Sequence, residues 1–368
     1  MTAQTEAQPG VRALVAGGGT GGHLFPGIAI AREISRRWAG SSILFVTGRR
    51  SMEQEILKQE GFLQESINVE GLKGRGWKRA ALVMVKLPWS LVQGVSILKR
   101  FSPHVVVGVG GYSSGPVCLA AWLLGVPSAI HEQNSFPGLT NRLLCRVVDR
   151  VFISFEESRP HFPRGSIYLT GNPVRDALFE ALETTSPGKG RFTILILGGS
   201  QGARAINRAF VQALEIMRGR GRDPMVIHQS GRGNYAEVVE DYRTRGLEGE
   251  VVPFIENMAE AYQKADMVVS RAGAGTIFEL AALGKPSVLI PFPHAANNHQ
   301  EANARVLVAA KGAEMILEKD LSPQVLADMI LKYMDDKGAH MAMAGAARAM
   351  GRRDAARIIV DHLGDMMQ

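Results

Sequence analysis

The sequence predicts an α/β protein made of two Rossmann-like, doubly wound domains that face a cleft. Short β-rich apolar runs alternate with helical segments, which is typical of a parallel sheet covered on both faces. A glycine-rich turn follows the first run of each half, at residues 17–22 and again at 198–202. Between the halves lies a Thr/Ser/Pro/Gly stretch, residues 184–190, which is typical of a linker.

Each half supplies five expected strands. In the first half these are residues 13–16, 43–46, 105–109, 128–130 and 151–153, with a helix over residues 26–38 after the first strand. In the second half they are residues 192–197, 225–228, 249–253, 267–269 and 287–290. Pro26 would lie near the first turn of its helix, where a missing N–H costs little. Residues 341–367 are helical in composition.

Composition excludes several classes of protein. Apolar residues make up 46% of the chain and charged residues 21%, as in a globular protein and unlike a disordered or fibrous one. The most apolar stretch, residues 80–98, contains Lys86, Pro88 and Gln93, so no transmembrane helix is expected. The first ten residues have no secretory signal pattern. Cys118 and Cys145 have no metal spacing, and we expect two core thiols in a reducing cytoplasm.

Positive charge is concentrated in the first half. Residues 1–170 carry 19 Lys and Arg against 11 Asp and Glu, whereas residues 171–368 have a net charge of −1. No acidic residue occurs from Gly71 to His131. Charge of this kind indicates a polyanionic partner, either nucleic acid or an anionic membrane surface.

The first glycine turn permits two interpretations. Gly17, Gly19 and Gly22 have the G-x-G-x-x-G spacing of dinucleotide sites, which also need an acidic residue at the end of the second strand. Residues 47–49 supply no carboxylate there, but an arginine would suit a 2′-phosphate, so an NADP-dependent oxidoreductase stays open. His23, at the start of the next helix, is a candidate general base because histidine titrates near neutral pH. The alternative is a structural histidine.

Four adjacent polar residues, His-Glu-Gln-Asn at 131–134, follow another predicted strand. A metal site there is disfavoured, because ligands from adjacent residues rarely converge on one ion. We expect Asn134 to reach substrate, and His131 and Glu132 to hold the loop. A second polar loop, residues 294–300, follows a strand of the second half.

The strongest local signal is residues 270–279, where small residues after a strand let a helix N-terminus meet phosphate with bare N–H groups. Glu279, one turn beyond Thr276, suits the hydroxyls of a ribose. The alternative is a Glu in the first helical turn that complements the helix dipole. The sequence has no D-x-D or Walker A motif. We therefore expect no metal or cofactor, and a diphosphate stabilised by helix N-termini and by Arg175 or Arg204.

Six blocks of the chain resemble the MurG family of bacterial UDP-N-acetylglucosamine:N-acetylmuramyl-(pentapeptide) pyrophosphoryl-undecaprenol N-acetylglucosamine transferases. In family order they are residues 18–26, 110–116, 131–141, 171–175, 198–204 and 271–279. The resemblance implies the glycosyltransferase B fold. Residues 1–172 would form an N-terminal acceptor and membrane-facing domain. Residues 173–346 would form a C-terminal UDP-GlcNAc-binding domain. A C-terminal helix, residues 347–368, would pack back on the first domain.

The same resemblance implies an inverting hexosyltransferase that moves GlcNAc from UDP-GlcNAc to lipid I, giving lipid II for peptidoglycan synthesis. His23 would be the general base, and the backbone of Ile255 would read uracil. Substrate binding is implied for Thr20, Gly21, Gly22, Tyr112, Asn134, Arg175, Ser200, Gln201, Ile255, Ala274, Gly275, Thr276, Ile277, Phe278, Glu279 and Gln300. The sequence departs from the family at Ala272, Gly275 and His299, where some members carry Ser, Leu and Gln.

The implied acceptor is anchored in lipid, so we expect a peripheral protein at the cytoplasmic face of the inner membrane. Cations and apolar side chains predict an anionic-surface contact at Lys73, Arg75, Trp77, Lys78, Arg79, Lys86 and Trp89. The alternative is an amphipathic helix packed on the sheet with a solvated basic face. A nucleic-acid partner is not expected, because no aromatic-rich binding sheet is present. Cell-wall synthesis proteins, and roles in cell shape and division, are further implications.

Overall fold

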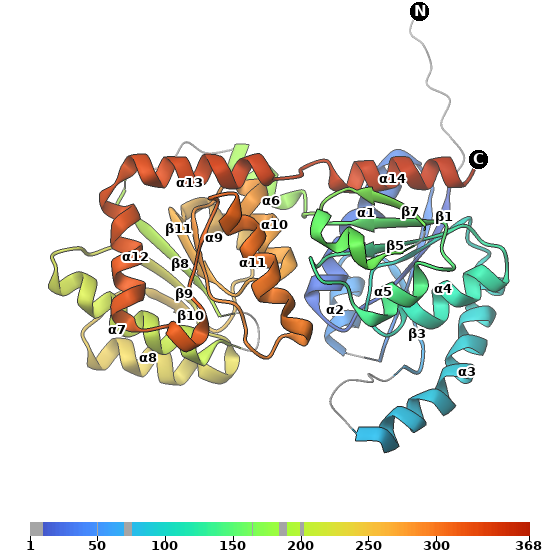
Figure 1. Cartoon of the computed structure of the whole chain (residues 1–368), viewed down its shortest axis with the longest axis horizontal. Helices are drawn as coiled ribbons and strands as arrows, with labels where there is room; N and C mark the ends of the chain where they lie inside the picture. The colour runs from blue at the N-terminus through green and yellow to red at the C-terminus, as the bar shows by residue number, and fades with distance from the viewer. Residues whose placement is uncertain (1–9, 50, 70–75, 164, 184–189, 199–201) are drawn as a thin grey trace, which may run out of the picture. The chain divides into compact units, whose positions relative to one another are not determined.

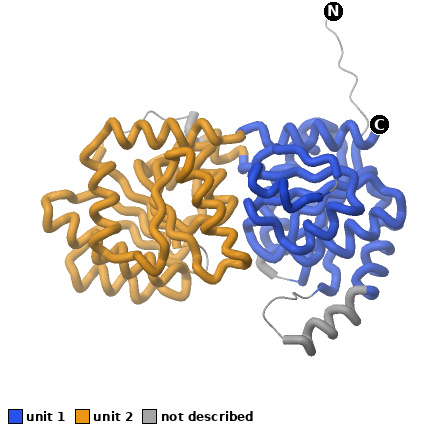
Figure 2. The backbone as a smooth tube through the Cα atoms, in the orientation of Figure 1, with its two compact units in different colours: residues 1–175, 353–368 blue, residues 176–352 orange. Residues whose placement is uncertain are grey.

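The computed structural model describes residues 10–49, 51–69, 76–163, 165–183, 190–198 and 202–368. It forms two compact units, drawn in different colours in Figure 2. Unit 1 is Met1–Arg175 with Arg353–Gln368, and unit 2 is Asp176–Arg352. These divisions fall a few residues beyond 172 and 346, where the sequence placed them. Each unit is an α/β fold on a parallel sheet, as the sequence predicts.

Unit 1 is built on a seven-stranded parallel sheet in the order β3-β2-β1-β4-β5-β6-β7. The strands are β1 (Arg12–Ala16), β2 (Ser42–Thr47), β3 (Leu63–Ser66), β4 (Val105–Gly108), β5 (Ser128–Glu132), β6 (Arg150–Ile153) and β7 (Ser166–Leu169). The order reverses between β1 and β4, the switch point at which doubly wound sheets bind ligands. The two strands missing from the sequence prediction, β3 and β7, are the edge strands, and neither has a fully buried residue.

The helices of unit 1 cover both faces of this sheet. They are α1 (Gly21–Arg37), α2 (Ser51–Gln59), α3 (Gly76–Phe101), α4 (Ser114–Leu123), α5 (Leu139–Leu144), α14 (Ala355–Met366) and the 3₁₀ helix Glu156–His161. Successive residues of a strand point to opposite faces. Val15 therefore joins a cluster with Ile28 of α1 and Ile359 of α14, while Leu14 joins one with Leu98 of α3 and Val117 of α4. Cys118 and Cys145 are buried free thiols, as expected.

Helix α1 begins five residues before the predicted start at Pro26. The carbonyl of Thr20 accepts hydrogen bonds from the N–H groups of His23 and Leu24, at 3.1 and 3.2 Å, and these bonds start the helix. Glycine has low helix propensity, so the sequence predicts a loop at Gly21 and Gly22. Pro26 consequently lies inside the helix, which corrects its expected place in the first turn.

A C-terminal helix packs back on unit 1, as expected, but its expected bounds, residues 347–368, are wrong. The structure has two helices there, α13 (Lys337–Met350) in unit 2 and α14 in unit 1 (Figure 1). The break falls at Gly351, whose Cβ position would be 2.8 Å from the Cα of Ala282. That close approach leaves no room for a side chain, and the chain leaves the helical path before α14 packs on α1.

Unit 2 repeats the architecture on a six-stranded parallel sheet, β10-β9-β8-β11-β12-β13. Its strands are β8 (Thr193–Leu197), β9 (Met225–Gln229), β10 (Glu250–Val252), β11 (Met267–Ser270), β12 (Ser287–Leu289) and β13 (Glu314–Met315). Its other helices are α6 (Ala177–Glu183), α7 (Arg204–Gly219), α8 (Tyr235–Thr244), α9 (Met258–Lys264), α10 (Ala274–Leu283), α11 (His299–Ala309) and α12 (Pro323–Asp335). The described part of unit 2 also contains the 3₁₀ helices Arg232–Asn234, Ala296–Asn298 and Glu318–Asp320. Within the described ranges, no helix has both the length and the apolar character needed to cross a bilayer.

Candidate active site

Two glycine loops meet at the carboxyl ends of β1 and β4 in unit 1. The N–H of Gly18 donates to the carbonyl of Gly110, at 3.3 Å, so the loops pack backbone against backbone. Gly110 has a φ of +91°, and a Cβ there would lie 2.7 Å from Nδ1 of His23. Only glycine combines that backbone conformation with such close packing. The loop after β4 therefore lies directly against the predicted base.

His23 is the third residue of α1 and is partly exposed. Its Nδ1 lies 2.9 Å from Oε1 of Gln133, which follows β5. The candidate base thus stands at the switch point of the sheet, where three successive loops converge. This is the position that the sequence predicts for it.

Glu132 organises the loop after β5. Its Oε1 accepts hydrogen bonds from the backbone N–H and the side-chain amide of Asn134, at 3.0 and 3.2 Å. Its Oε2 accepts from the N–H of Gly138 and the side chain of Asn141, at 3.1 and 2.8 Å. Glu132 and its neighbours therefore hold the loop, as expected. Among the described residues there is no grouping of three or more His, Cys, Asp or Glu that could hold a metal ion.

His131 lies fully buried beneath this loop. Its Nε2 is 3.1 Å from the carbonyl of Gly171 and 3.2 Å from Oγ of Ser154. Burial lowers the pKa of His131 to about 4, against a smaller opposing effect of the Gly171 carbonyl. His131 is consequently neutral at physiological pH and acts within the loop, away from solvent.

Glu53 is a residue of the site that sequence reasoning missed. Its side chain, 1% exposed, reaches from α2 to the first glycine loop, where Oε1 accepts the N–H of Gly19. A dinucleotide would use that N–H for its pyrophosphate, and a carboxylate occupies it here. The geometry therefore disfavours the NADP interpretation. The dinucleotide pattern places its carboxylate at the end of the second strand, whereas Glu53 belongs to the following helix, α2.

The N-terminus of α10 is the candidate site of unit 2. Gly273 precedes it, and its first turn contains no acidic residue. Gly275, Thr276 and Glu279 are partly exposed, whereas the side chains of Ile277 and Phe278 are buried. Those two residues can offer a ligand only backbone groups. Glu279 is the sixth residue of the helix, so the alternative that places it in the first turn is wrong.

Three side-chain contacts shape the surroundings of α10. The hydroxyl of Tyr262 donates to Oε2 of Glu279, at 2.9 Å. Oε1 of Gln300 accepts from the N–H groups of Ala272 and Phe292, at 3.2 and 2.9 Å, so Gln300 would meet a sugar through its amide nitrogen. The N–H of Ile255 donates to Oε1 of Gln229, at 3.0 Å. This N–H is therefore already bonded, and the carbonyl of Ile255 is the backbone group that would contact the uracil.

Comparison with known proteins identifies the family. The models of the glycosyltransferase family 28 N-terminal and C-terminal domains match residues 13–153 and 193–359. A Syntrophus aciditrophicus protein named UDP-N-acetylglucosamine--N-acetylmuramyl-(pentapeptide) pyrophosphoryl-undecaprenol N-acetylglucosamine transferase is 46% identical over 95% of this chain and 97% of its own. A Myxococcus xanthus protein of the same name is 43% identical over 97% and 93%. The crystal structure of Acinetobacter baumannii MurG superposes with a TM-score of 0.77 at 30% identity, covering 96% of this chain and 99% of that one.

The chain belongs to the MurG family, within glycosyltransferase family 28. It is a glycosyltransferase with two Rossmann-like units, as the sequence predicts. The remaining site residues expected of a MurG-family member are placed as follows. Tyr112 is 43% exposed after the Gly110 turn, and Thr20 is exposed just before α1. The guanidinium of Arg175 lies 4.5 Å from the ring centroid of Phe25 in α1. Arg204, by contrast, is paired with Glu237 at 3.1 Å.

Several expected residues lie outside the part of the chain that the structure describes. Ser200, Gln201, Lys73 and Arg75 belong to the undescribed ranges. The side chains of four further residues of the expected membrane contact are also outside it, namely Trp77, Lys78, Arg79 and Lys86. The MurG-family contacts expected of these residues stay predictions.

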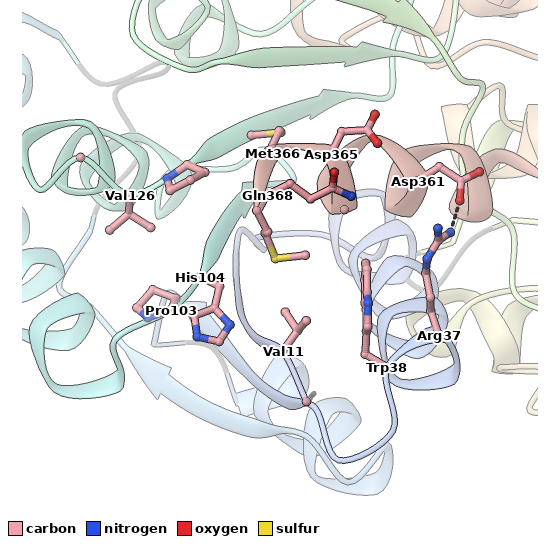
Figure 3. Close-up of a pocket in the computed structure, with 15 residues that line it drawn as sticks. Val11, Arg37, Trp38, Pro103, His104, Val126, Asp361, Asp365, Met366 and Gln368 are labelled. Carbon is pink, nitrogen blue, oxygen red and sulfur yellow. Dashed lines mark hydrogen bonds and ion pairs between the residues drawn. The ribbon is translucent and has the colours of Figure 1, made fainter. Parts of the chain in front are cut away.

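A cavity of about 800 Å³ lies elsewhere in unit 1 (Figure 3). It is lined by Val11 and His104, which precede β1 and β4, by Trp38, which follows α1, and by Met366 of α14. It therefore opens at the amino ends of the strands. Doubly wound folds bind ligands at the opposite, carboxyl ends.

Proposed function

We propose that this protein transfers GlcNAc from UDP-GlcNAc to lipid I, undecaprenyl-pyrophosphoryl-MurNAc-pentapeptide, and forms lipid II for peptidoglycan synthesis. The observation that carries the proposal is the 46% identity to the Syntrophus aciditrophicus transferase across 95% of the chain. The site supports it chemically. One unit supplies a histidine beside a glycine loop, and the other supplies a helix N-terminus with no acid in its first turn.

In this reaction His23 removes the proton from the attacking hydroxyl of the acceptor. The hydroxyl oxygen bonds to the anomeric carbon of GlcNAc from the face opposite the diphosphate. The bond between that carbon and the diphosphate oxygen breaks, and UDP leaves with the electron pair, so the configuration inverts. The N–H groups at the start of α10 stabilise the negative charge on the departing diphosphate.

Donor recognition follows from the same arrangement. Glu279, held by Tyr262, accepts hydrogen bonds from the ribose hydroxyls, and the carbonyl of Ile255 meets the uracil. The amide nitrogen of Gln300 donates to the sugar, and so does Asn134. Positive charge from Arg175 adds to that of the helix N-terminus.

We propose that no divalent cation takes part. The sequence has no D-x-D motif to bind a metal–nucleotide complex. The N-terminus of α10 and Arg175 would therefore balance the negative charge of the diphosphate. Transfer rates should then be the same with EDTA and with added Mg²⁺. Loss of activity in EDTA that Mg²⁺ restores would contradict this part of the proposal.

We further propose peripheral attachment to the cytoplasmic face of the inner membrane. Large apolar side chains are exposed on three helices of unit 1, of which α4 packs against both α3 and α5. Trp89 is 60% exposed on α3, Trp122 is 52% exposed on α4, and Leu143 is 55% exposed on α5. Exposed apolar groups beside a basic stretch suit an anionic lipid surface. Cell-wall synthesis proteins as partners, and roles in cell shape and division, follow if lipid II is the product.

The test of the reaction is transfer of radiolabelled GlcNAc from UDP-GlcNAc to a soluble lipid I analogue. We expect a labelled product only when both substrates are present. UDP should raise the Tm of the protein, whereas NADPH and a single-stranded oligonucleotide should not. Stabilisation by NADPH without transfer would overturn the proposal in favour of an oxidoreductase.

The test of the membrane contact is co-sedimentation with phosphatidylglycerol vesicles at low salt. Replacing Lys73, Arg75, Lys78 and Arg79 with Ser should release the protein while UDP binding is kept, because each cation near an anionic surface adds about 1 kcal/mol. A matched control replaces four arginines of unit 2 with Ser, at Arg208, Arg220, Arg222 and Arg243, and should stay bound. Unchanged sedimentation of the first variant would exclude this patch.

A further inference from the structure

A hydrogen-bonded chain of side chains leads from His23 into the interior of unit 1. Nδ1 of His23 is 2.9 Å from Oε1 of Gln133. Nε2 of Gln133 is 2.9 Å from the carbonyl of Val109 and 3.0 Å from Nδ1 of His131. Nε2 of His131 in turn is 3.1 Å from the carbonyl of Gly171. Except for Gln133 and His131, which are two residues apart, the linked groups are distant in sequence, and the chain ends on backbone carbonyls.

The carbonyls determine which atoms donate. A carbonyl oxygen only accepts, so Nε2 of His131 must carry its proton and donate to Gly171. Nδ1 of His131 is then unprotonated and accepts from the amide of Gln133. The second amide hydrogen of Gln133 donates to Val109. Both donors of Gln133 are thus committed at its nitrogen, and its oxygen must face His23.

The oxygen of Gln133 in turn determines the tautomer of His23. Because Oε1 can only accept, Nδ1 of His23 must carry a hydrogen. In a neutral imidazole the other nitrogen, Nε2, is then the one with a lone pair. The arrangement holds at physiological pH, because burial lowers the pKa of His131 to about 4 and keeps its Nδ1 an acceptor.

The packing leaves little room for another arrangement. Gln133 and His131 are 1% and 0% exposed, so water does not compete for their hydrogen bonds. Gly110 approaches the same Nδ1 closely enough that a Cβ would be 2.7 Å from it and 3.5 Å from Oε1 of Gln133. The imidazole is therefore confined in orientation as well as in protonation.

We propose that Gln133 is a positioning residue that fixes His23 as the Nδ1–H tautomer and leaves Nε2 as its basic atom. The tautomer itself does not depend on the proposed function, but its use does. In the transfer reaction the acceptor proton passes to Nε2, the acceptor oxygen bonds to the anomeric carbon, and UDP leaves with the electron pair. The imidazolium then donates from Nδ1 to Gln133, an oxygen already in place to receive it.

The first test is ¹⁵N NMR of the full-length protein with labelled histidine. The chain has nine histidines, and the His23 signals are those lost in His23→Gln. In the resting protein with a neutral imidazole, we expect Nδ1 of His23 to have a protonated, pyrrole-like shift and Nε2 an unprotonated, pyridine-like shift. The reverse pattern would overturn the proposal, whatever substrate the protein uses.

The second test removes the acceptor. Gln133→Met keeps length and apolar volume but cannot accept from His23, so we expect mixed tautomers in the NMR spectrum. We also expect kcat to fall about tenfold or more with the KM for UDP-GlcNAc unchanged. Gln64→Met, on the edge strand β3, is the matched control and should match the wild type in both measurements.

A variant one step further along the chain separates positioning from folding. His131→Asn keeps a polar atom near Nδ1 to accept from Gln133, whereas His131→Leu does not. If the two variants have equal Tm, His131→Asn should keep more of the wild-type tautomer and a higher kcat than His131→Leu. If Gln133→Met and His131→Leu both fold and retain the wild-type spectrum and kcat, Gln133 has no positioning role. Absence of transfer by the wild type would instead refute the proposed function and leave the NMR result standing.

Discussion

Unit 1 and unit 2 share a sheet order that reverses beside the central strand, yet their ligand-facing helices begin differently. At the start of α1, the loop N–H of Gly19 is occupied by the carboxylate of Glu53, and a histidine follows in the first helical turn. At the start of α10, no acid lies in the first turn, and the carboxylate of Glu279 comes only at the sixth residue.

The difference shows that a helix N-terminus after a glycine turn is not by itself an anion site. An anion site needs N–H groups with no acidic side chain in the first helical turn, a condition that α10 meets. Where a buried carboxylate has already taken one, as at α1, the same backbone can present a base. One topology thereby presents a candidate base in unit 1 and a candidate anion site in unit 2.

The sharpest test of that contrast is His23→Ala. Loss of a general base should lower kcat by about 10²–10⁴ with the donor KM little changed. His104→Ala, an exposed histidine at the amino ends of the strands, should behave as the wild type. A His23→Ala enzyme with near-normal kcat would show that His23 has a structural role in its loop and is not the general base.

Acid should destabilise both units through one buried histidine each. Burial lowers the pKa of His131 to about 4 and that of His228 to about 3, from 6.5. Below pH 6.5 the unfolded chain therefore binds protons that the native chain does not, and stability falls as pH falls. The slope is about 1.4 kcal/mol per pH unit for each histidine.

This slope can be measured for unit 1 alone, because all four tryptophans lie in its part of the sequence. Urea unfolding followed by tryptophan fluorescence between pH 7 and 5 should become easier with acid, and less so in His131→Asn. The effect of His228→Asn should appear in circular dichroism. If the urea concentration at the fluorescence midpoint does not change with pH, His131 is not held neutral in the native protein.

Glu53→Ala tests the occupied loop of unit 1. It leaves the N–H of Gly19 without its carboxylate acceptor, which should lower the free energy of unfolding by about 1–3 kcal/mol. Glu53→Gln keeps an acceptor oxygen and should lose less. Glu55→Ala, exposed on the same helix, should change stability by at most about 0.5 kcal/mol. Equal stability of the Glu53 and Glu55 alanine variants would contradict the role of Glu53.

Glu279→Gln tests unit 2 and should have the smallest effect. A ribose contact persists from ground state to transition state, so the donor KM should rise about tenfold with kcat nearly unchanged. Tyr262→Phe, which removes the hydrogen bond to Glu279, should raise KM less. The exposed Glu248→Gln serves as control. An unchanged KM with a lowered kcat would mean that Glu279 acts on the reaction step.

Much of the fold could be predicted because its inner strands are continuous apolar runs. All five residues of β8 are buried, for example, and the sequence places that strand within one residue. The edge strands β3 and β7 lack this signal because their side chains are mostly half-exposed. The two-residue β13 is too short for any periodicity to predict.

The site residues also divide into those with a local sequence signal and those without one. His23 and Glu279 could be predicted because each lies at a fixed distance from a glycine or small-residue turn. Glu53 and Gln133 could not be assigned, because their partners are 34 and 110 residues away in the chain. Only tertiary packing determines that a carboxylate of α2 reaches Gly19, or that an amide beyond β5 turns its oxygen toward α1.

The packing of α14 on α1 has a consequence for synthesis of the protein. Ile359 and Leu363 complete a core that begins with Ile28 and Ile34, yet residues 176–352 are translated between them. A ribosome therefore releases the first of these helices long before the last exists. During that interval one apolar side of α1 lacks its cover, and unit 2 has the opportunity to fold first. The nascent chain is then a natural client for chaperones until its final turns emerge.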